Sequence, residues 1–245
     1  GSGLSNWTTP TCTTYNSLFG DCYSLETISG WNIASGAVCT NMFRNGAYIA
    51  PTDTIRSGLL ANSGLSTIYG NLNLPNWTLN GNNNCAYMFA NAHDFTGSGL
   101  DNWNTSGISN MAGMFYGNYK LDTNKISGWT TPYNTSLDST FAYSSGLDIS
   151  VIKNFNTSGV TSAANLFLKA NVTGDLSNID WSNCTSFSRT FGGYDAVTAT
   201  DYSRGANANL VGWKFKQSGA LGAIFNQFAR GNPNFNANVS GWDLG

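Results

Sequence analysis

The sequence of 245 residues has little charge: Lys, Arg, Asp and Glu together make up 10% of it, and the formal net charge is −2. It contains one histidine, His93, and one glutamate, Glu26. A protein that binds nucleic acid through the phosphates needs a basic face, and 11 cations among 13 acids do not supply one. No apolar run approaches about 18 residues, so we expect no transmembrane helix and no membrane insertion.

Side chains that carry chemistry are also scarce. A catalytic triad would have to use His93, which the repeat pattern described below places in a surface loop. The five cysteines include no Cys-x-x-Cys pair, and the aspartates share no repeat position, so neither a zinc site nor a pair of glycosidase carboxylates is indicated. The sequence therefore predicts that the protein is not an enzyme and has no cofactor and no metal site.

Uncharged polar residues and aromatics fill the chain instead. There are 33 Asn, 27 Ser, 25 Thr and 28 Gly residues, and aromatics make up 13%. Asn, Ser, Thr and Gly are mediocre helix formers and good turn formers. This composition disfavours a helical enzyme and favours a fold rich in turns around an aromatic core.

One aromatic position recurs along almost the whole chain, and its spacing is constant from Trp77 to Trp181. The recurring residues are Trp7, Trp31, Trp77, Trp103, Trp129, Phe155, Trp181, Trp213 and Trp242. We count each repeat position from this aromatic. Position +12 is a phenylalanine in most units, for example Phe89 after Trp77 and Phe115 after Trp103.

The neighbouring positions repeat as well. Position −3 is aliphatic in all units but one, and positions +8, +11 and +12 are mostly apolar, which is the spacing of one face of a short helix or 3-10 turn. Cys39 and Cys85 occupy position +8 and are expected to be buried, whereas Cys12 and Cys22 could pair in a disulfide. Position −1 contains only Asn, Gly or Asp, which tolerate positive φ, and therefore predicts a sharp bend after an extended segment.

A unit of about 26 residues cannot bury its apolar side alone and must stack on its neighbours. We therefore predict an α/β fold: a leucine-rich-repeat-like solenoid whose short extended segments stack into a parallel sheet, with short helical or 3-10 turns on the other side. Residues 1–245 should form a single domain of about eight repeats. The spacing between recurring aromatics is longer from Trp31 to Trp77 and from Trp181 to Trp213. These longer spacings predict an insertion or degenerate coil at 44–73 and a smaller insertion at 194–208.

Two segments resemble a known repeat family. Residues 100–117 read LDNWNTSGISNMAGMFYG and residues 152–160 read IKNFNTSGV. They are similar to the tandem repeats of the BspA-like leucine-rich-repeat surface proteins, of the type I-S-x-W-x-T-S-x-V-x-x-M-x-x-M-F. The resemblance implies a repeat protein of bacterial or protist surfaces associated with adhesion to host cells, matrix or other microbes. Related repeats also occur in phage-encoded proteins.

These observations together predict a non-catalytic recognition or adhesion module that is extracellular, on a cell surface or a virion surface, and binds a glycan, a protein or an envelope component. The alternative is a structural assembly subunit, such as part of a phage tail fibre, a capsid decoration or a surface filament, and a homo-oligomer fits either. If there is a ligand face, it should be the stacked extended segments, whose side chains at position −2 point outward. The candidate ligand-binding residues there are Ser29, Asp101, Ser127 and Lys153.

Overall fold

The computed structural model describes residues 3–8, 11–22, 24–45, 69–192, 206–215, 226, 228–230 and 235–243, and among these there are short strands and 3-10 helices but no α-helix. The strands are β1 (Asn32–Ile33), β2 (Thr78–Leu79), β3 (Asn83–Asn84), β4 (Ile108–Asn110), β5 (Ser145–Asp148), β6 (Asn171–Asp175), β7 (Asp180–Trp181), β8 (Ala206–Asn209) and β9 (Lys214–Phe215). The 3-10 helices are η1 (Leu4–Asn6), η2 (Leu100–Asn102), η3 (Thr123–Ile126) and η4 (Ile149–Asn154).

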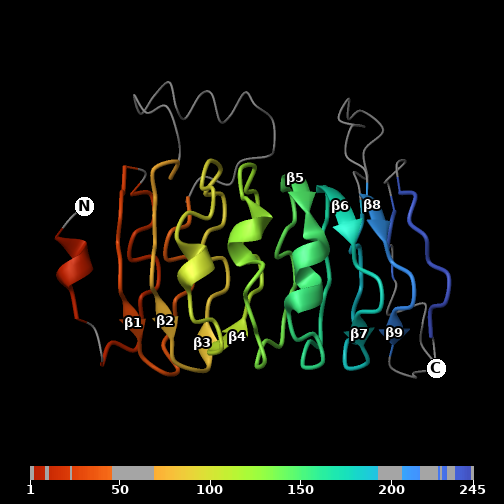
Figure 1. Cartoon of the computed structure of the whole chain (residues 1–245), viewed down its shortest axis with the longest axis horizontal. Helices are drawn as coiled ribbons and strands as arrows, with labels where there is room; N and C mark the ends of the chain where they lie inside the picture. The colour runs from red at the N-terminus through yellow and green to blue at the C-terminus, as the bar shows by residue number, and fades with distance from the viewer. Residues whose placement is uncertain are drawn as a thin grey trace.

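Among the described residues every strand pair is parallel and joins neighbouring repeats, at or near the same repeat position. The pairs are β1 with β2, β3 with β4, β7 with β9, and the three-stranded order β5-β6-β8. Thr78, directly after Trp77, pairs on one side with Asn32 and on the other with Asn104. The repeats consequently lie side by side in chain order (Figure 1). The fold class is thus confirmed in its coarse form, as small parallel strands in several sheets with few helical turns.

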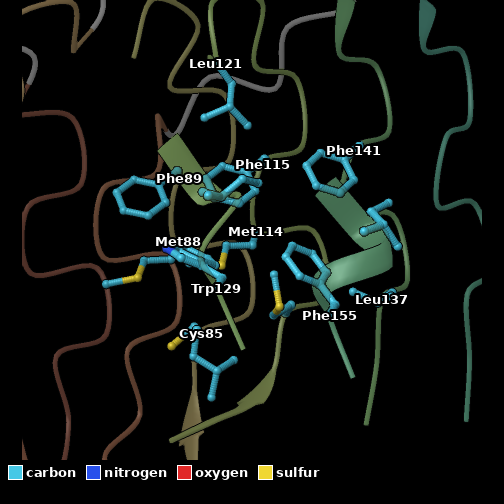
Figure 2. Close-up of a cluster of buried hydrophobic side chains, with 14 of the residues drawn as sticks. Cys85, Met88, Phe89, Met114, Phe115, Leu121, Trp129, Leu137, Phe141 and Phe155 are labelled. Carbon is cyan, nitrogen blue, oxygen red and sulfur yellow. The ribbon is translucent and has the colours of Figure 1, made fainter. Parts of the chain in front are cut away.

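The two aromatic positions form the core, as predicted. Trp77 and Trp103 stack with ring centroids 5.2 Å apart at 3°, and Phe43 and Phe89 stack at 5.4 Å and 4°. The indole N–H of Trp129 donates to the carbonyl oxygen of Leu100, at position −3 of the preceding unit, at 2.9 Å. Figure 2 shows the phenylalanine and tryptophan rings in this core, with methionine and leucine side chains around them. Between residues 28 and 192, the described rings at these two positions are each no more than 7% exposed.

The ends of the repeat array depart from this rule. Trp7 is 53% exposed although its ring stacks on Trp31 at 6.3 Å, and Leu18 and Val239 are 42% and 43% exposed. Trp242 is partly buried against the core. Each of these residues lies in the first or the last described repeat, where a neighbour packs on one side only.

The predicted helical turn at positions +8 to +12 is wrong. Residues 85–91 form a run of hydrogen-bonded turns in which every second N–H group donates to the next repeat: those of Cys85, Tyr87 and Phe89 donate to its carbonyls at 3.0, 2.7 and 3.0 Å. The intervening Met88 and Ala90 donate to nearby carbonyls of their own repeat. We call this segment, positions +8 to +14, the turn ladder. The turn ladder joins successive repeats because its N–H groups donate alternately to carbonyls of their own repeat and of the next repeat.

The turn ladder has a regular backbone. The residue at position +10 has positive φ, between 54° and 61°, in most repeats, and its equivalent before Phe191 does as well. These residues are Ser17, Asn41, Tyr87, Gly113, Ser139, Asn165 and Arg189. Tyr and Arg have no intrinsic preference for this region, so the pairing with the neighbouring repeats imposes it.

The predicted bend at position −1 is only partly correct. φ is positive at Gly30, Asn76, Gly212 and Gly241, whereas Asp180 lies in strand β7. Three other −1 residues are the last residue of a 3-10 helix, so that the segment before the aromatic is helical there and not extended. They are Asn6, Asn102 and Asn154.

Side-chain caps begin two of the 3-10 helices, η3 and η4, whereas η1 and η2 have no side-chain cap. The side chains of Asp122 and Asp148 accept hydrogen bonds from the N–H groups of Asn124 and Ser150 at the starts of η3 and η4. The N–H of the following aromatic then closes the turn, as in Phe155, which donates to the Ile152 carbonyl at 3.0 Å. A local turn satisfies these donors without a neighbouring strand.

The single-domain prediction over 1–245 stays a prediction. Of the predicted insertion at 44–73, residues 46–68 lie outside the described part of the chain. Residues 194–205 of the second predicted insertion lie outside it too, and residues 206–208 belong to strand β8.

One core position carries an amide where its neighbours are aliphatic. Asn134 is 1% exposed, and neither polar atom of its side chain has a hydrogen-bond partner among the described residues. Ile108 and Val160 hold the same position in the flanking repeats and are fully buried. We expect Asn134→Val to raise the free energy of unfolding by about 1–2 kcal/mol in urea denaturation, because it removes the desolvation cost of an unsatisfied amide.

A second buried asparagine provides the control. The Asn118 amide donates to the carbonyls of Ala92 and Phe95 at 3.0 and 3.1 Å, and its oxygen accepts two backbone N–H groups. Asn118→Val should therefore destabilise the protein. If both variants lose stability equally, the environment assigned to Asn134 is wrong.

Candidate functional site

Three of the four predicted ligand residues lie in or directly after 3-10 helices and not on stacked extended segments, which corrects the predicted face for them. Asp101 is in η2, Lys153 is in η4, and Ser127 directly follows η3. Ser29 precedes Trp31 outside any helix and is half-buried, whereas the other three are exposed. The coils of η2, η3 and η4 follow one another along the same face of the repeats (Figure 1).

The structure connects these residues to neighbouring repeats and does not gather them into one site. The Asp101 carboxylate accepts from the Lys125 ammonium at 3.3 Å. The Lys153 ammonium lies 2.7 Å from an Asp175 oxygen and 3.1 Å from the Ser177 hydroxyl. Both charged candidates are therefore already paired with the next repeat along the chain.

The two serines also bridge repeats. The N–H of Ser29 donates to the Ser5 hydroxyl at 3.1 Å, and the carbonyl of Ser127 accepts from the Asn154 amide at 2.7 Å. Asp101, Ser127 and Lys153 thus brace the face formed by η2, η3 and η4, which we call the 3-10 helix face, and the charges of Asp101 and Lys153 are less available to a ligand.

The electrostatics of this face support the bracing role. The Lys153 ammonium, the Ser177 N–H and the Ser177 hydroxyl hold the pKa of the Asp175 carboxyl well below its usual range. A carboxyl with a depressed pKa in the folded state stabilises the protein above its unfolded pKa and loses that contribution as pH falls through the folded pKa. Asp175 therefore stays ionised at all but strongly acidic pH, and the Lys153 pair persists across the physiological range.

A different set of side chains, one exposed and four half-buried, lies on the turn ladder in two groups. The rings of Tyr116 and Tyr143 lie 4.9 Å apart, and the Lys169 ammonium lies 5.1 Å from the Tyr143 ring. The Arg44 guanidinium carbon lies 5.9 Å from the ring of Tyr87, which is 38% exposed. We call Arg44, Tyr87, Tyr116, Tyr143 and Lys169 the aromatic stripe.

A glycine adjoins the first tyrosine of the aromatic stripe. A Cβ atom added at Gly113 would lie 2.2 Å from the Tyr87 ring, so that ring lies directly on the backbone of the next repeat. Tyrosine and arginine are the residue types enriched in recognition surfaces, because a rigid ring offers apolar area and its hydroxyl offers a hydrogen bond. The aromatic stripe can therefore bind a partner without performing a reaction.

Sequence reasoning missed this stripe because its tyrosines occupy three different repeat positions. Tyr87 is at +10, Tyr116 at +13 and Tyr143 at +14, so no single position reveals them. The usable signal was the burial pattern: once +8, +11 and +12 are assigned to the core, tyrosines at the intervening positions stand out.

The prediction that His93 lies in a surface loop is wrong. It is 0% exposed, its Nδ1 donates to the Gly117 carbonyl at 2.7 Å, and its ring stacks on Tyr119 at 5.0 Å and 6°. His93 and Tyr119 share position +16 in neighbouring repeats, and the stacking of repeats therefore buries the ring.

The cysteines are free thiols, so the Cys12–Cys22 disulfide is absent from the structure. Cys39, Cys85 and Cys184 are buried. Among the described residues, no group of three or more His, Cys, Asp or Glu side chains is placed to hold a metal ion. Nor does any helix in that part of the chain have the length and apolar character needed to cross a membrane.

The comparison with protein families gives one match. Residues 1–52 and 83–204 match the family described as Mycoplasma protein of unknown function, DUF285. The comparisons with curated proteins and with solved structures gave no match. Since the matched ranges cover most of its length, the chain belongs to the DUF285 family.

Proposed function

We propose that this protein is a non-catalytic recognition module, displayed on a cell or virion surface, that binds a glycan, a protein or another component of a cell envelope through the aromatic stripe. The observation that carries the proposal is the row of tyrosines and cations held on the outside of the turn ladder. The similarity to BspA-like surface repeats favours the same class of function.

The scaffold we propose is one leucine-rich-repeat-like solenoid. Support comes from the hydrogen bonds of the turn ladder, which recur with the same spacing: Phe43, Phe89 and Phe115 each donate an N–H to the next repeat at 2.8, 3.0 and 3.0 Å. A solenoid holds many outward side chains at fixed spacing, and several weak contacts along it add to a useful affinity.

The aromatic stripe is a better binding surface than the 3-10 helix face. The charges of Asp101 and Lys153 are engaged by neighbouring repeats. Tyr87, by contrast, is exposed, and aromatic anchors carry a large part of the binding energy in many interfaces.

The test compares tyrosines inside and outside the stripe. We expect Tyr87→Ala and Tyr143→Ala to lower binding to intact cells or to an array of envelope glycans and proteins at least about tenfold. Tyr133, 61% exposed and outside the stripe, is the matched control, and Tyr133→Ala should bind like the unaltered protein. Circular dichroism confirms that each variant is folded. Loss of binding in Tyr133→Ala or Lys153→Ala, with the stripe variants unaffected, would place the site elsewhere.

Binding should also depend little on salt. Charged groups are 10% of the sequence, and the aromatic stripe holds only two cations. Salt screens exposed charges over about 8 Å at physiological ionic strength, and few charges are present here for it to screen. The same assay at low and high salt should therefore show that most of the binding is retained at high salt. Loss of most binding at high salt would show that a charged patch dominates.

The second candidate, an assembly subunit, rests on the apolar side chains at the ends of the described repeats. Trp7 and Leu18 at one end and Val239 at the other are 53%, 42% and 43% exposed. Head-to-tail contact between copies would cover them. Sedimentation of the purified chain separates the two functions: a monomer that binds cells supports recognition, and a polymer that binds none supports assembly.

A further inference from the structure

Two buried cysteines lie at the same position of neighbouring repeats. Cys39 and Cys85 occupy position +8 of consecutive units, and the residues just before them, Val38 and Asn84, form a parallel bridge. The Cys39 N–H donates to the Asn84 carbonyl at 2.8 Å, which fixes the register at this point. Both cysteine side chains are 0% exposed and belong to the same core, where Cys85 lies among buried hydrophobic side chains (Figure 2).

The spacing suits a covalent bond. Parallel neighbours in a sheet are about 4.8 Å apart, and a disulfide spans Cα separations of about 4.4–6.8 Å. We propose that Cys39 and Cys85 form a disulfide when the protein folds in an oxidising environment, and that this bond staples two consecutive repeats. It would close a covalent loop of the chain from Cys39 to Cys85.

The thiols already interact in the reduced protein. The pKa of Cys85 is raised well above its usual value, first by a hydrogen bond with the Cys39 thiol, then by burial and then by the charge of Cys39. A thiolate is the species that attacks a disulfide, so the closed core makes exchange slow. The bond should therefore form before the core closes, and once buried it should resist reductants under native conditions.

The chemistry is thiol–disulfide exchange with a low-molecular-weight disulfide such as glutathione disulfide. The thiolate of Cys39 attacks one sulfur of this oxidant, forms a mixed disulfide and releases one glutathione thiolate, which takes up a proton. The Cys85 thiolate then attacks the Cys39 sulfur and releases the second glutathione. The protein loses two protons and two electrons, and the oxidant is reduced to two thiols.

Refolding of the reduced full-length chain with glutathione disulfide tests the proposal. We expect a Cys39–Cys85 linked peptide in the mass spectrum, two hydrogens lighter than the separate peptides. The thermal midpoint should be higher than that of the reduced protein by roughly 5–10 °C, given the loop closed and the size of the domain. The same oxidant added to the folded, reduced protein should form the link at least about tenfold more slowly, because both thiols are buried.

Two variants keep the result interpretable. Cys39→Ala should abolish the linked peptide and the thermal gain, whereas Cys12→Ser with Cys22→Ser should change neither, since Cys12 and Cys22 are not among the buried cysteines. Recovery of Cys39 and Cys85 as free thiols after refolding with oxidant would overturn the proposal, as would a linked protein that melts below the reduced one.

Discussion

Replacing Trp103 by alanine should lower the free energy of unfolding by about 3–5 kcal/mol. The indole stacks on Trp77 at 5.2 Å and on Trp129 at 5.8 Å, and its N–H donates to the Leu74 carbonyl at 2.5 Å. The variant leaves a cavity between two repeats and an unsatisfied buried carbonyl. Urea denaturation followed by far-ultraviolet circular dichroism measures the loss.

Trp7 is the matched control for this prediction, because it has the same repeat position and the same ring stacking but is 53% exposed. Trp7→Ala should cost less than about 1 kcal/mol, in line with its smaller burial. Equal losses in the two variants would mean that the tryptophans contribute something other than core packing.

Replacing Gly107 by alanine should be as damaging, at about 3 kcal/mol or more, although only one methyl group is added. A Cβ atom at Gly107 would lie 2.1 Å from the Gly81 nitrogen and 2.2 Å from the Leu79 carbonyl oxygen. Both are backbone atoms of the preceding repeat, so no side chain can move aside and the repeats must separate locally. Thermal and urea unfolding should both show the loss.

Gly128→Ala is the control, because a Cβ atom there meets nothing within 4 Å and the backbone of Gly128 is outside the left-handed region. The free energy of unfolding of this variant should stay within about 0.5 kcal/mol of that of the unaltered protein. A tolerated Gly107→Ala would contradict the close approach of consecutive repeats at this point.

The aromatic core could be predicted from the sequence because rings that recur at one repeat position stack on the rings of the neighbouring repeats and are buried where a repeat has a neighbour on both sides. Trp103 and Phe115 keep their repeat positions whatever the backbone does between them. The intervening backbone could not be predicted in the same way. Positions +8, +11 and +12 fit a helical face, but alternate N–H donors of this segment find acceptors in the next repeat, as Cys85 does in the carbonyl of Asn110. No pattern within a single repeat reveals such a partner.

The intrinsic preferences of single residues also gave wrong predictions of the backbone conformation where contacts with the neighbouring repeat determine it. Tyr87 and Arg189 adopt positive φ although neither residue type favours it, and Asn102 ends a 3-10 helix although Asn favours a bend. The candidate site shows the same limit. The −2 position marked Asp101 and Lys153 as outward, which is correct, but their pairing with Lys125 and Asp175 depends on which repeats touch.

Oxidative footprinting of the tyrosines tests the recognition surface most directly. Hydroxyl radicals modify exposed tyrosine rings, and a bound partner shields the rings that it covers. With the purified chain bound to cell-envelope material, modification of Tyr87 should fall at least about threefold relative to the free protein, as expected of a ring in the desolvated centre of an interface, while Tyr133 should be modified equally in both states. Shielding of Tyr133 with Tyr87 unchanged would contradict recognition through the aromatic stripe.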